Sequence, residues 1–391
     1  MIINKKDSKL EIKLEGRIDT NNAPDVEQEI MSALDANDCK EPVFDAENLD
    51  YISSAGLRVL MKVRKKINKP VDVINVSKDV YDIFETTGFT DLLNVKKAYR
   101  KISIDGLQLL GQGMTGNVYR MDDETVLKVF HPNISFDLLI SKENKKARNA
   151  FVYGVPTAIP YDIVKVGDCY GIVYEMIKSK DLATVMSEDK SKIEEYMTMF
   201  AKTVRQMHSI HVEAGKLDDL KTTSIQALGY FKSVMTDEEI QKVQRVYENI
   251  PDSDIFIHGD CHMGNAMLQD GELMFIDLSS GGMGHPIFDM VSMYSIYERA
   301  DNDKARAASP MLRLFSSDEI KKMWNVFIHT YFEGKDDEFI KEAEKQIALF
   351  SVTRRLFMYV ALPGSLTPEQ FNAMKDRVIS SVDAGIDPIC F

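Results

Sequence analysis

Strand-like and helix-like spacing alternate along the first hundred residues. The stretch KLEIKLEGRI, residues 9–18, alternates polar and apolar positions as a half-buried strand does. APDVEQEIMSALDAN, residues 23–37, has helical spacing with Pro24 near its start. The same reasoning predicts strands at EPVFDAEN and PVDVINV, and helices at SSAGLRVLMKVRKKI and SKDVYDIFETTG. Strands separated by helices predict a sheet with helices packed on it.

A change of pattern marks a second unit. The basic, polar segment VKKAYRKISIDG, residues 95–106, is predicted as a linker with a boundary near residue 101. The chain then reads strand, glycine turn, strand, a helix near 140–153 and two more strands. From about residue 181 it is mostly helical, except for a loop and strand at 256–279. We therefore expect an α/β domain at 1–101 and an α+β, two-lobed domain at 102–391, with its small lobe at about 102–178 and its large lobe at about 179–391.

Composition limits what these domains do. The 391 residues exceed what one core usually supports, and the four cysteines form no CxxC motif that would indicate disulfides or zinc. The net charge of −13 argues against binding to nucleic acid or to an anionic membrane, and is compatible with a cationic small substrate. No apolar run resembles a signal peptide or a membrane span, so we expect a cytoplasmic protein.

Three glycines lie in the turn that opens the second unit. In GQGMTGNVY, Gly111, Gly113 and Gly116 separate two predicted strands. Glycine lets backbone N–H groups approach phosphate oxygens, because it has no Cβ and positive φ is free. A strand follows the turn, which disfavours a dinucleotide site and favours a kinase-type cover over the phosphates of ATP. An ordinary hairpin turn is the alternative for this motif alone.

Lys128 is flanked by apolar residues in the strand VLKVF, twelve residues after Gly116. A buried lysine needs an anionic partner. We predict that Glu143, in the helical SKENKKARNA, is that partner, together with the α and β phosphates of the nucleotide. The alternative is an edge-strand lysine whose ammonium group reaches water.

The motif HGDCHMGNAML, residues 258–268, is followed by FIDL at 275–278. In phosphoryl transfer a carboxylate accepts the proton of the attacking hydroxyl, and oxygen ligands hold Mg²⁺ on the ATP phosphates. We predict that Asp260 has the first role and that Asn265 and Asp277 hold the metal. The nearby His258 and His262 could suggest zinc, but we expect structural hydrogen bonds from both.

This motif, with MFIDLSSGGMGHPIFDM after it, resembles the signature of the aminoglycoside phosphotransferase and choline kinase superfamily, whose fold resembles that of protein kinases. The resemblance covers residues 107 to about 365. It implies a catalytic Asp, a metal-binding Asn, a metal-binding Asp and a nucleotide-binding Lys at Asp260, Asn265, Asp277 and Lys128. It also implies adenine binding by the backbone from Glu175 to Ile177, and a bracing or capping role for Asp289.

Residues 1–100 resemble a STAS domain, the fold of bacterial anti-sigma factor antagonists. The order of strands and helices carries the resemblance, as do YISSAGLRVL and IFETTGFTDLL. It implies that Ser54 corresponds to the serine phosphorylated during partner switching. Ser53 stands where the family usually has Asp, and Ala55 replaces a second Ser or Thr. On the residues alone, Ser53 or Ser54 is simply a helix cap.

The leading hypothesis is an ATP- and Mg²⁺-dependent phosphotransferase that acts on the hydroxyl of a small molecule, with the STAS domain regulating it or docking a protein partner. One alternative is a protein kinase-like regulator that phosphorylates a serine of a STAS domain. Another is a partner-switching protein that senses nucleotide without turnover. The acidic chain favours an amine-bearing acceptor, and the substitution Asp260→Asn distinguishes the catalytic hypotheses from the non-catalytic one.

Overall fold

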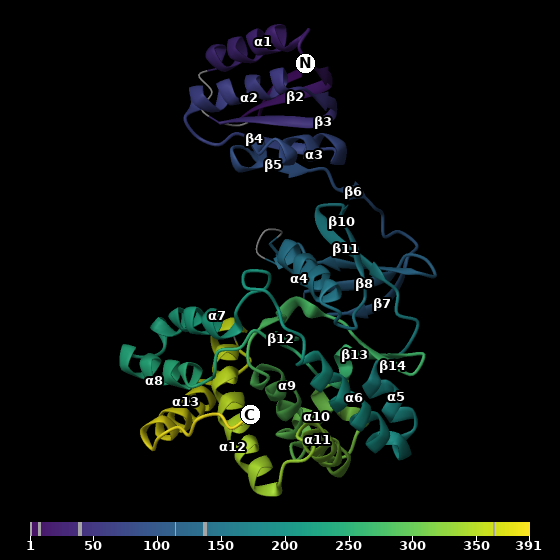
Figure 1. Ribbon diagram of the computed structural model, residues 1–391, viewed down its shortest axis with the longest axis vertical. Helices are drawn as coiled ribbons and strands as arrows, with labels where there is room; N and C mark the ends of the chain where they lie inside the picture. The colour runs from purple at the N-terminus through teal and green to yellow at the C-terminus, as the bar shows by residue number, and fades with distance from the viewer. Residues whose placement is uncertain (1, 7–8, 38–40, 114, 136–138, 363) are drawn as a thin grey trace. The chain divides into compact units, whose positions relative to one another are not determined.

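The computed structural model describes residues 2–6, 9–37, 41–113, 115–135, 139–362 and 364–391. Cys39 and Met114 lie outside the described residues. The chain separates into two units, Met1–Ser103 and Ile104–Phe391. Figure 1 shows the elements of each unit.

The first unit is a sheet whose strands follow in chain order, with parallel pairing except between β1 and β2. Its strands are β1 (Ile2–Lys6), β2 (Lys9–Ile18), β3 (Pro42–Ile52), β4 (Asp72–Val76) and β5 (Asn94–Lys97). Its helices, α1 (Ala23–Ala36), α2 (Ser54–Ile67) and α3 (Lys78–Thr86), connect consecutive parallel strands. Right-handed crossovers in one direction place all three helices on one face. Leu10, Ile12 and Leu14 are accordingly buried, and the predicted α/β fold is confirmed.

Two strands of this sheet, β1 and β5, were not predicted. The linker prediction for residues 95–106 is wrong at its beginning, because β5 pairs in parallel with β4, Val95 beside Val73. A short strand with one apolar residue among lysines has a linker's composition, and Val95 packs against the core all the same. At the other edge, β1 forms an antiparallel pair with β2, Ile3 opposite Ile12. The short strand β6 (Arg100–Lys101) follows β5.

The second unit begins with the predicted small β-rich lobe. It contains β7 (Gln108–Gln112), β8 (Gly116–Arg120), β9 (Thr125–Phe130), α4 (Ser141–Val152), β10 (Pro160–Val166) and β11 (Cys169–Glu175). Its strands lie in the order β10-β11-β9-β8-β7, with antiparallel pairing throughout. Lys128 therefore lies on a central strand, between Val118 of β8 and Ile172 of β11.

The large lobe is mostly helical. Its helices are α5 (Leu182–Glu188), α6 (Ile193–Met207), α7 (Leu220–Ala227), α8 (Asp237–Glu248), α9 (Ile287–Tyr297), α10 (Asp303–Ala308), α11 (Ser317–Tyr331), α12 (Asp337–Ala361) and α13 (Pro368–Asp383). Its predicted loop-and-strand region, residues 256–279, contains two short antiparallel strand pairs. These are β12 (Phe256–Ile257) with β15 (Gly282–Met283), just beyond that region, and β13 (Ala266–Gln269) with β14 (Glu272–Phe275). No helix among the described residues is both long and apolar enough to cross a bilayer.

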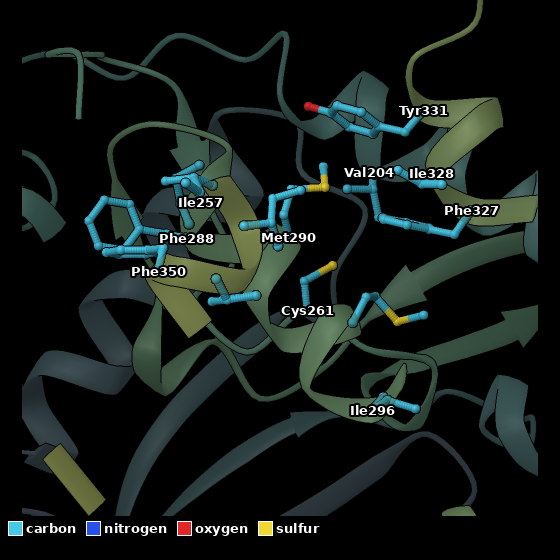
Figure 2. Packing of buried hydrophobic residues seen from close by; sticks show 14 of the residues in the cluster. Val204, Ile257, Cys261, Phe288, Met290, Ile296, Phe327, Ile328, Tyr331 and Phe350 are labelled. Carbon is cyan, nitrogen blue, oxygen red and sulfur yellow. The ribbon is translucent and has the colours of Figure 1, made fainter. Parts of the chain in front are cut away.

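Helix α9 lies in the core of the large lobe, and Figure 2 shows its Phe288 and Met290 among the surrounding apolar side chains. Phe288 packs edge-on against Phe350 of α12, with ring centroids 5.1 Å apart. Met290 is completely buried. A helix with so many buried positions carries its polar side chains into the core too, and Asp289 is 1% exposed. A buried carboxylate requires polar partners.

Candidate active site

Lys128 makes the predicted contact with Glu143 and a further one, not predicted, with Asp277. Its Nζ lies 2.8 Å from Glu143 Oε1 on α4 and 3.3 Å from Asp277 Oδ1. The Tyr174 hydroxyl donates to the same Glu143 oxygen at 3.1 Å. The Lys128 side chain is 12% exposed and that of Glu143 is 5% exposed. This geometry contradicts the alternative of a lysine that reaches water.

Charge governs this cluster. Burial alone would lower the pKa of Lys128, but the carboxylates of Glu143 and Asp277 overcome it and raise the pKa above its ordinary value. For the carboxyl group of Asp277, burial alone would raise the pKa, but Lys128 and the Ser279 hydroxyl lower it below its ordinary value. The ammonium and the Asp277 carboxylate are therefore both charged at neutral pH. Together they can neutralise phosphate and bind a cation.

The glycine turn has a different physical basis from the predicted one. None of Gly111, Gly113 and Gly116 has a positive φ. A Cβ on Gly116 would lie 2.2 Å from the carbonyl oxygen of Val129, so Gly116 is needed for close packing on β9. The Gly113 N–H donates to the Gly116 carbonyl at 2.8 Å. Gly111 has no atom within 4 Å of its Cβ position, which leaves its backbone open to a ligand.

The segment from Glu175 to Ile177 is partly engaged with the protein itself. The N–H of Glu175 donates to the Ile159 carbonyl at 2.9 Å, and the N–H of Met176 donates to the Glu124 carbonyl at 2.7 Å. The Glu175 carboxylate accepts from the Ile159 N–H. The Ile177 N–H is therefore the donor of this segment that best fits an adenine ring.

Asp260 and Asn265 lie in one loop and contact each other. The Asn265 side-chain amide donates to the Asp260 carbonyl at 3.0 Å and to Asp260 Oδ2 at 3.3 Å. A 3₁₀ turn, Met263–Asn265, produces this approach. Burial would raise the pKa of Asp260, but His262, Arg354 and His258 lower it below its ordinary value. The Asp260 carboxyl is thus ionised at neutral pH, and it lines a pocket of about 880 Å³ in the large lobe.

The buried Asp289 braces this loop, as expected. Its two oxygens accept the N–H groups of His258 at 2.9 Å and Gly259 at 2.6 Å. His208 Nε2 donates to Asp289 at 3.0 Å, while His208 Nδ1 accepts from the Tyr331 hydroxyl at 2.7 Å. These bonds satisfy the buried carboxylate and fix the backbone that precedes Asp260.

Backbone hydrogen bonds connect the Asp260 loop to Asp277. The Ile276 N–H donates to the Asn265 carbonyl at 2.9 Å, and His258 Nε2 donates to the Ile276 carbonyl at 3.0 Å. Asp277 has φ of 59°, in the left-handed region. Ile276 is thus hydrogen-bonded through both its N–H and its carbonyl group. This brings the backbone of Asn265, just before β13, next to that of the residue preceding Asp277, which follows β14. The two residues predicted to hold the metal are thus brought together.

The donors at this point fit Mg²⁺. Asn265 uses its amide nitrogen for Asp260, so its Oδ1 remains for a cation, and Asp277 contributes a carboxylate. Hard oxygen donors with room for water are what Mg²⁺ prefers. No group of three or more His, Cys, Asp or Glu side chains in the described parts of the chain could hold a metal, so this site rests on Asn265, Asp277 and the oxygens of a bound nucleotide. His258 and His262 make structural hydrogen bonds, His262 Nδ1 accepting from the Gly264 N–H at 3.1 Å.

Two positioning residues were not predicted. Arg354 of α12 donates to the Gly259 carbonyl at 2.5 Å and to the Phe288 carbonyl at 3.1 Å. Lys146 of α4 donates to the Ser279 carbonyl and pairs with Asp218, both at 3.3 Å. Lys146 follows Glu143 by three positions, a helical spacing that could have indicated it. Nothing near Arg354 in the sequence points to Gly259.

In the first unit, Ser53 and Ser54 have separate roles. Ser53 caps α2, its hydroxyl accepting from the N–H groups of Ala55 at 3.2 Å and Gly56 at 3.4 Å. Ser54 is the first residue of the helix and is exposed. The hydroxyl of Ser54 is thus not required for the cap.

Comparisons with known proteins match both units. The phosphotransferase enzyme family matches residues 106–313, and the STAS domain matches residues 1–102. The first unit is 32% identical over 98 residues to BtrV of Bordetella bronchiseptica, which is named as an anti-sigma factor antagonist; the match covers 24% of this chain and 84% of BtrV. The anti-sigma-B factor antagonist of Staphylococcus aureus is 27% identical over 95 residues, covering 24% of this chain and 87% of that protein.

Two solved structures are similar to the second unit at low identity. A choline/ethanolamine kinase family protein from Mesorhizobium loti is 16% identical, with a TM-score of 0.43, over 71% of this chain and 87% of that chain. The aminoglycoside phosphotransferase APH(3'')-Id from Streptomyces rimosus is 15% identical, with a TM-score of 0.41, over 63% of this chain and 93% of that chain. The family match covers more than half of the chain. The protein therefore belongs to the phosphotransferase enzyme family and joins a STAS domain to that family's kinase-like fold.

Proposed function

We propose that the protein transfers the γ-phosphoryl group of ATP to the hydroxyl of a small molecule, with Mg²⁺ as cofactor. The observation that carries this proposal is the ionised Asp260, which Asn265 contacts and which lines an 880 Å³ pocket. A carboxylate at the wall of a pocket can accept a proton from a bound hydroxyl. The family membership supports a kinase-type enzyme without specifying the acceptor.

Most of the predicted residues have a role in this reaction, Gly116 being the exception because it serves close packing on β9. Lys128, oriented by Glu143, contacts the α and β phosphates, and the backbone near Gly111 and Gly113 covers them. Asn265 and Asp277 hold the magnesium ion, which supplies positive charge to the phosphate oxygens. Ile177, next to Glu175, offers its backbone to adenine. Asp260 accepts the proton of the attacking hydroxyl, and Asp289 and Arg354 hold its loop in place.

The test compares the wild-type protein with Asp260→Asn in the presence of Mg²⁺ and γ-labelled ATP. A panel of small hydroxyl compounds is offered, and transfer of label to each compound is measured. We expect transfer by the wild type and a loss of about 10²- to 10⁴-fold in the variant, as removal of a general base produces. Equal transfer by both proteins would contradict the role of Asp260.

A second candidate function is phosphorylation of a STAS serine, with the STAS domain as a switch that docks a protein partner. The exposure of Ser54, whose hydroxyl the cap does not need, favours it. The same incubation tests it: label on Ser54 in the wild type but not in Asp260→Asn supports this function. An unlabelled STAS domain argues for a docking or regulatory role alone.

A further inference from the structure

The pocket beside Asp260 is lined by several helices and loops of the large lobe. Helices α7, α9 and α12 contribute to its wall, as does the segment 309–312. Its apolar surface includes Phe288 and Phe350, whose edge-on contact is visible in Figure 2. Serine residues also line it, at Ser224, Ser292, Ser295, Ser309 and Ser351. Such a lining suits a molecule with both apolar and polar surface.

The charges of the pocket oppose those of the chain. Its lining includes three arginines, Arg299, Arg354 and Arg355, and Asp260 is its single carboxylate among the described residues. The chain as a whole has a net charge of −13. The nearby Glu298 offsets part of this positive charge, since its carboxylate lies 3.4 Å from Arg355. The acidic character of the protein therefore does not extend to the pocket.

Two of the three guanidinium groups, those of Arg299 and Arg354, make no hydrogen bond or ion pair with a carboxylate among the described residues, although Arg354 acts on Asp260 at longer range. Arg354 contacts neutral acceptors, the carbonyls of Gly259 and Phe288 and the Ser292 hydroxyl. The Arg299 guanidinium has no hydrogen-bond or ion-pair partner among the described residues. Arg355 pairs with Glu298, but its buried Nε has no hydrogen-bond partner among the described residues. Unneutralised guanidinium groups at a pocket wall are ready donors to a carboxylate or phosphate.

We propose that the acceptor of this enzyme is an anion, a hydroxyl compound that carries a carboxylate or phosphate group bound by Arg299, which lines the same pocket as Asp260. This inference rests on the proposed function and names its substrate class. It differs from the amine-bearing acceptor that the net charge of the chain favours. A cationic group in this pocket would face three arginines with Asp260 as its single attraction.

The reaction with such an acceptor is balanced without a further reactant. The acceptor's hydroxyl oxygen forms a bond to the γ-phosphorus, and the bond from that phosphorus to the oxygen bridging the β phosphate breaks. ADP leaves with the electron pair of the broken bond. The Asp260 carboxylate takes the hydroxyl proton. The anionic group of the acceptor stays unchanged at the arginines.

A matched series of hexoses tests the charge preference. Glucose is neutral, glucuronate carries a carboxylate, glucose 6-phosphate carries a phosphate and glucosamine carries an ammonium group. Binding to the full chain is measured by titration calorimetry with each compound. We expect glucuronate or glucose 6-phosphate to bind about tenfold or more tightly than glucose, as one charge-assisted contact provides, and glucosamine to bind least. The stronger of the two anions identifies the charged group.

Three variants test the assignment to Arg299. Arg299→Gln should remove most of the preference for the anion, and Arg299→Lys should restore part of it. Because the Arg299 guanidinium has no hydrogen-bond or ion-pair partner in the described parts of the chain, neither change breaks such a bond. Arg313→Gln is the matched control, since Arg313 is exposed and does not line the pocket. It should bind all four hexoses as the wild type does.

Binding and transfer separate the two proposals. If neither anion binds better than glucose, or if glucosamine binds best, the anionic acceptor is wrong, whatever the rate of phosphoryl transfer. If an anion binds through Arg299 but no label moves to it from ATP, the proposed function is wrong and the pocket is an anion-binding site. Anion binding that Arg299→Gln leaves unchanged overturns the assignment to Arg299.

Discussion

The two sides of the candidate active site are held together by different forces. On the loop side, residues 256–265 with Asp289 and Arg354, backbone groups bond to buried side chains. On the nucleotide side, Lys128, Glu143 and Asp277 are held by attraction between opposite charges. The comparison indicates that the position of Asp260, the proposed proton acceptor, depends on a folded core, whereas that of Lys128, the proposed phosphate-binding lysine, depends on its counter-charges.

Asp289→Ala should destabilise the loop side, and its effect is the largest that we expect. The change leaves the N–H groups of His258 and Gly259, as well as His208, without their acceptor in the core. We expect a loss of about 3–5 kcal/mol in the free energy of unfolding. Urea unfolding followed by the fluorescence of Trp324, the single tryptophan, measures it.

The matched control for that experiment is Asp301→Ala. Asp301 is exposed and pairs with Lys321 at 2.7 Å. An exposed ion pair contributes little, so the unfolding midpoint should barely move. Similar small shifts in both variants would show that Asp289 is not a brace.

Lys128→Met, on the nucleotide side, should lower activity more than it lowers the stability of the fold. Glu143 can take up a proton once its partner is gone, which limits the cost of leaving it buried. Loss of a charged hydrogen-bond donor to phosphate should lower kcat/KM for ATP by roughly 10- to 100-fold. Lys165→Met, on β10 of the same sheet, is the control and should leave this value unchanged. A protein that fails to fold would instead make Lys128 a structural residue.

The glycine turn sharpens the comparison within the nucleotide side. In Gly116→Ala the new methyl group would meet the backbone of Val129, at a cost of about 1–3 kcal/mol. Gly111→Ala meets nothing, so its stability should match that of the wild type. Thermal unfolding by circular dichroism compares the two. Equal melting temperatures would contradict the close packing of Gly116 on β9.

The smallest effect concerns pH. The pKa values of Asp260 and Asp277 lie below the ordinary value of 3.8, so both carboxylates stay ionised as the pH falls toward that value. The acid limb of kcat/KM should accordingly lie below pH 3.8, within the range where circular dichroism shows a folded protein. His262→Gln removes a contact that lowers the pKa of Asp260, and should move the limb upward by less than about one unit. A limb that His262→Gln leaves in place would contradict its assignment to Asp260.

The sequence predicted those parts of the site that lie on regular elements or in a compact motif. Lys128 and Glu143 are brought into contact by a strand and a helix that follow each other in the chain. Asp260 and Asn265 are five residues apart and contact each other directly. In both cases local spacing determines most of the geometry.

Other residues could not be predicted because their position depends on packing of distant helices. Arg354 reaches Gly259 across 95 residues of sequence, and the direction of its side chain follows from the way α12 packs on α9. Arg299 has no feature in the sequence that would indicate its place in the pocket lining. The strand β5 was missed for a related reason, since its partner β4 creates the environment that buries part of Val95.

The three arginines in the pocket wall of an acidic protein affect the rates at which an anionic acceptor would bind and leave. At a distance, a net charge of −13 repels an anionic acceptor, and salt shortens the reach of that repulsion to about 10 Å at 0.1 M. Inside the pocket the attraction acts at contact distance, where salt screens it less. Moderate ionic strength should thus speed the capture of the acceptor while leaving its release almost unchanged, the opposite of what a cationic acceptor would experience.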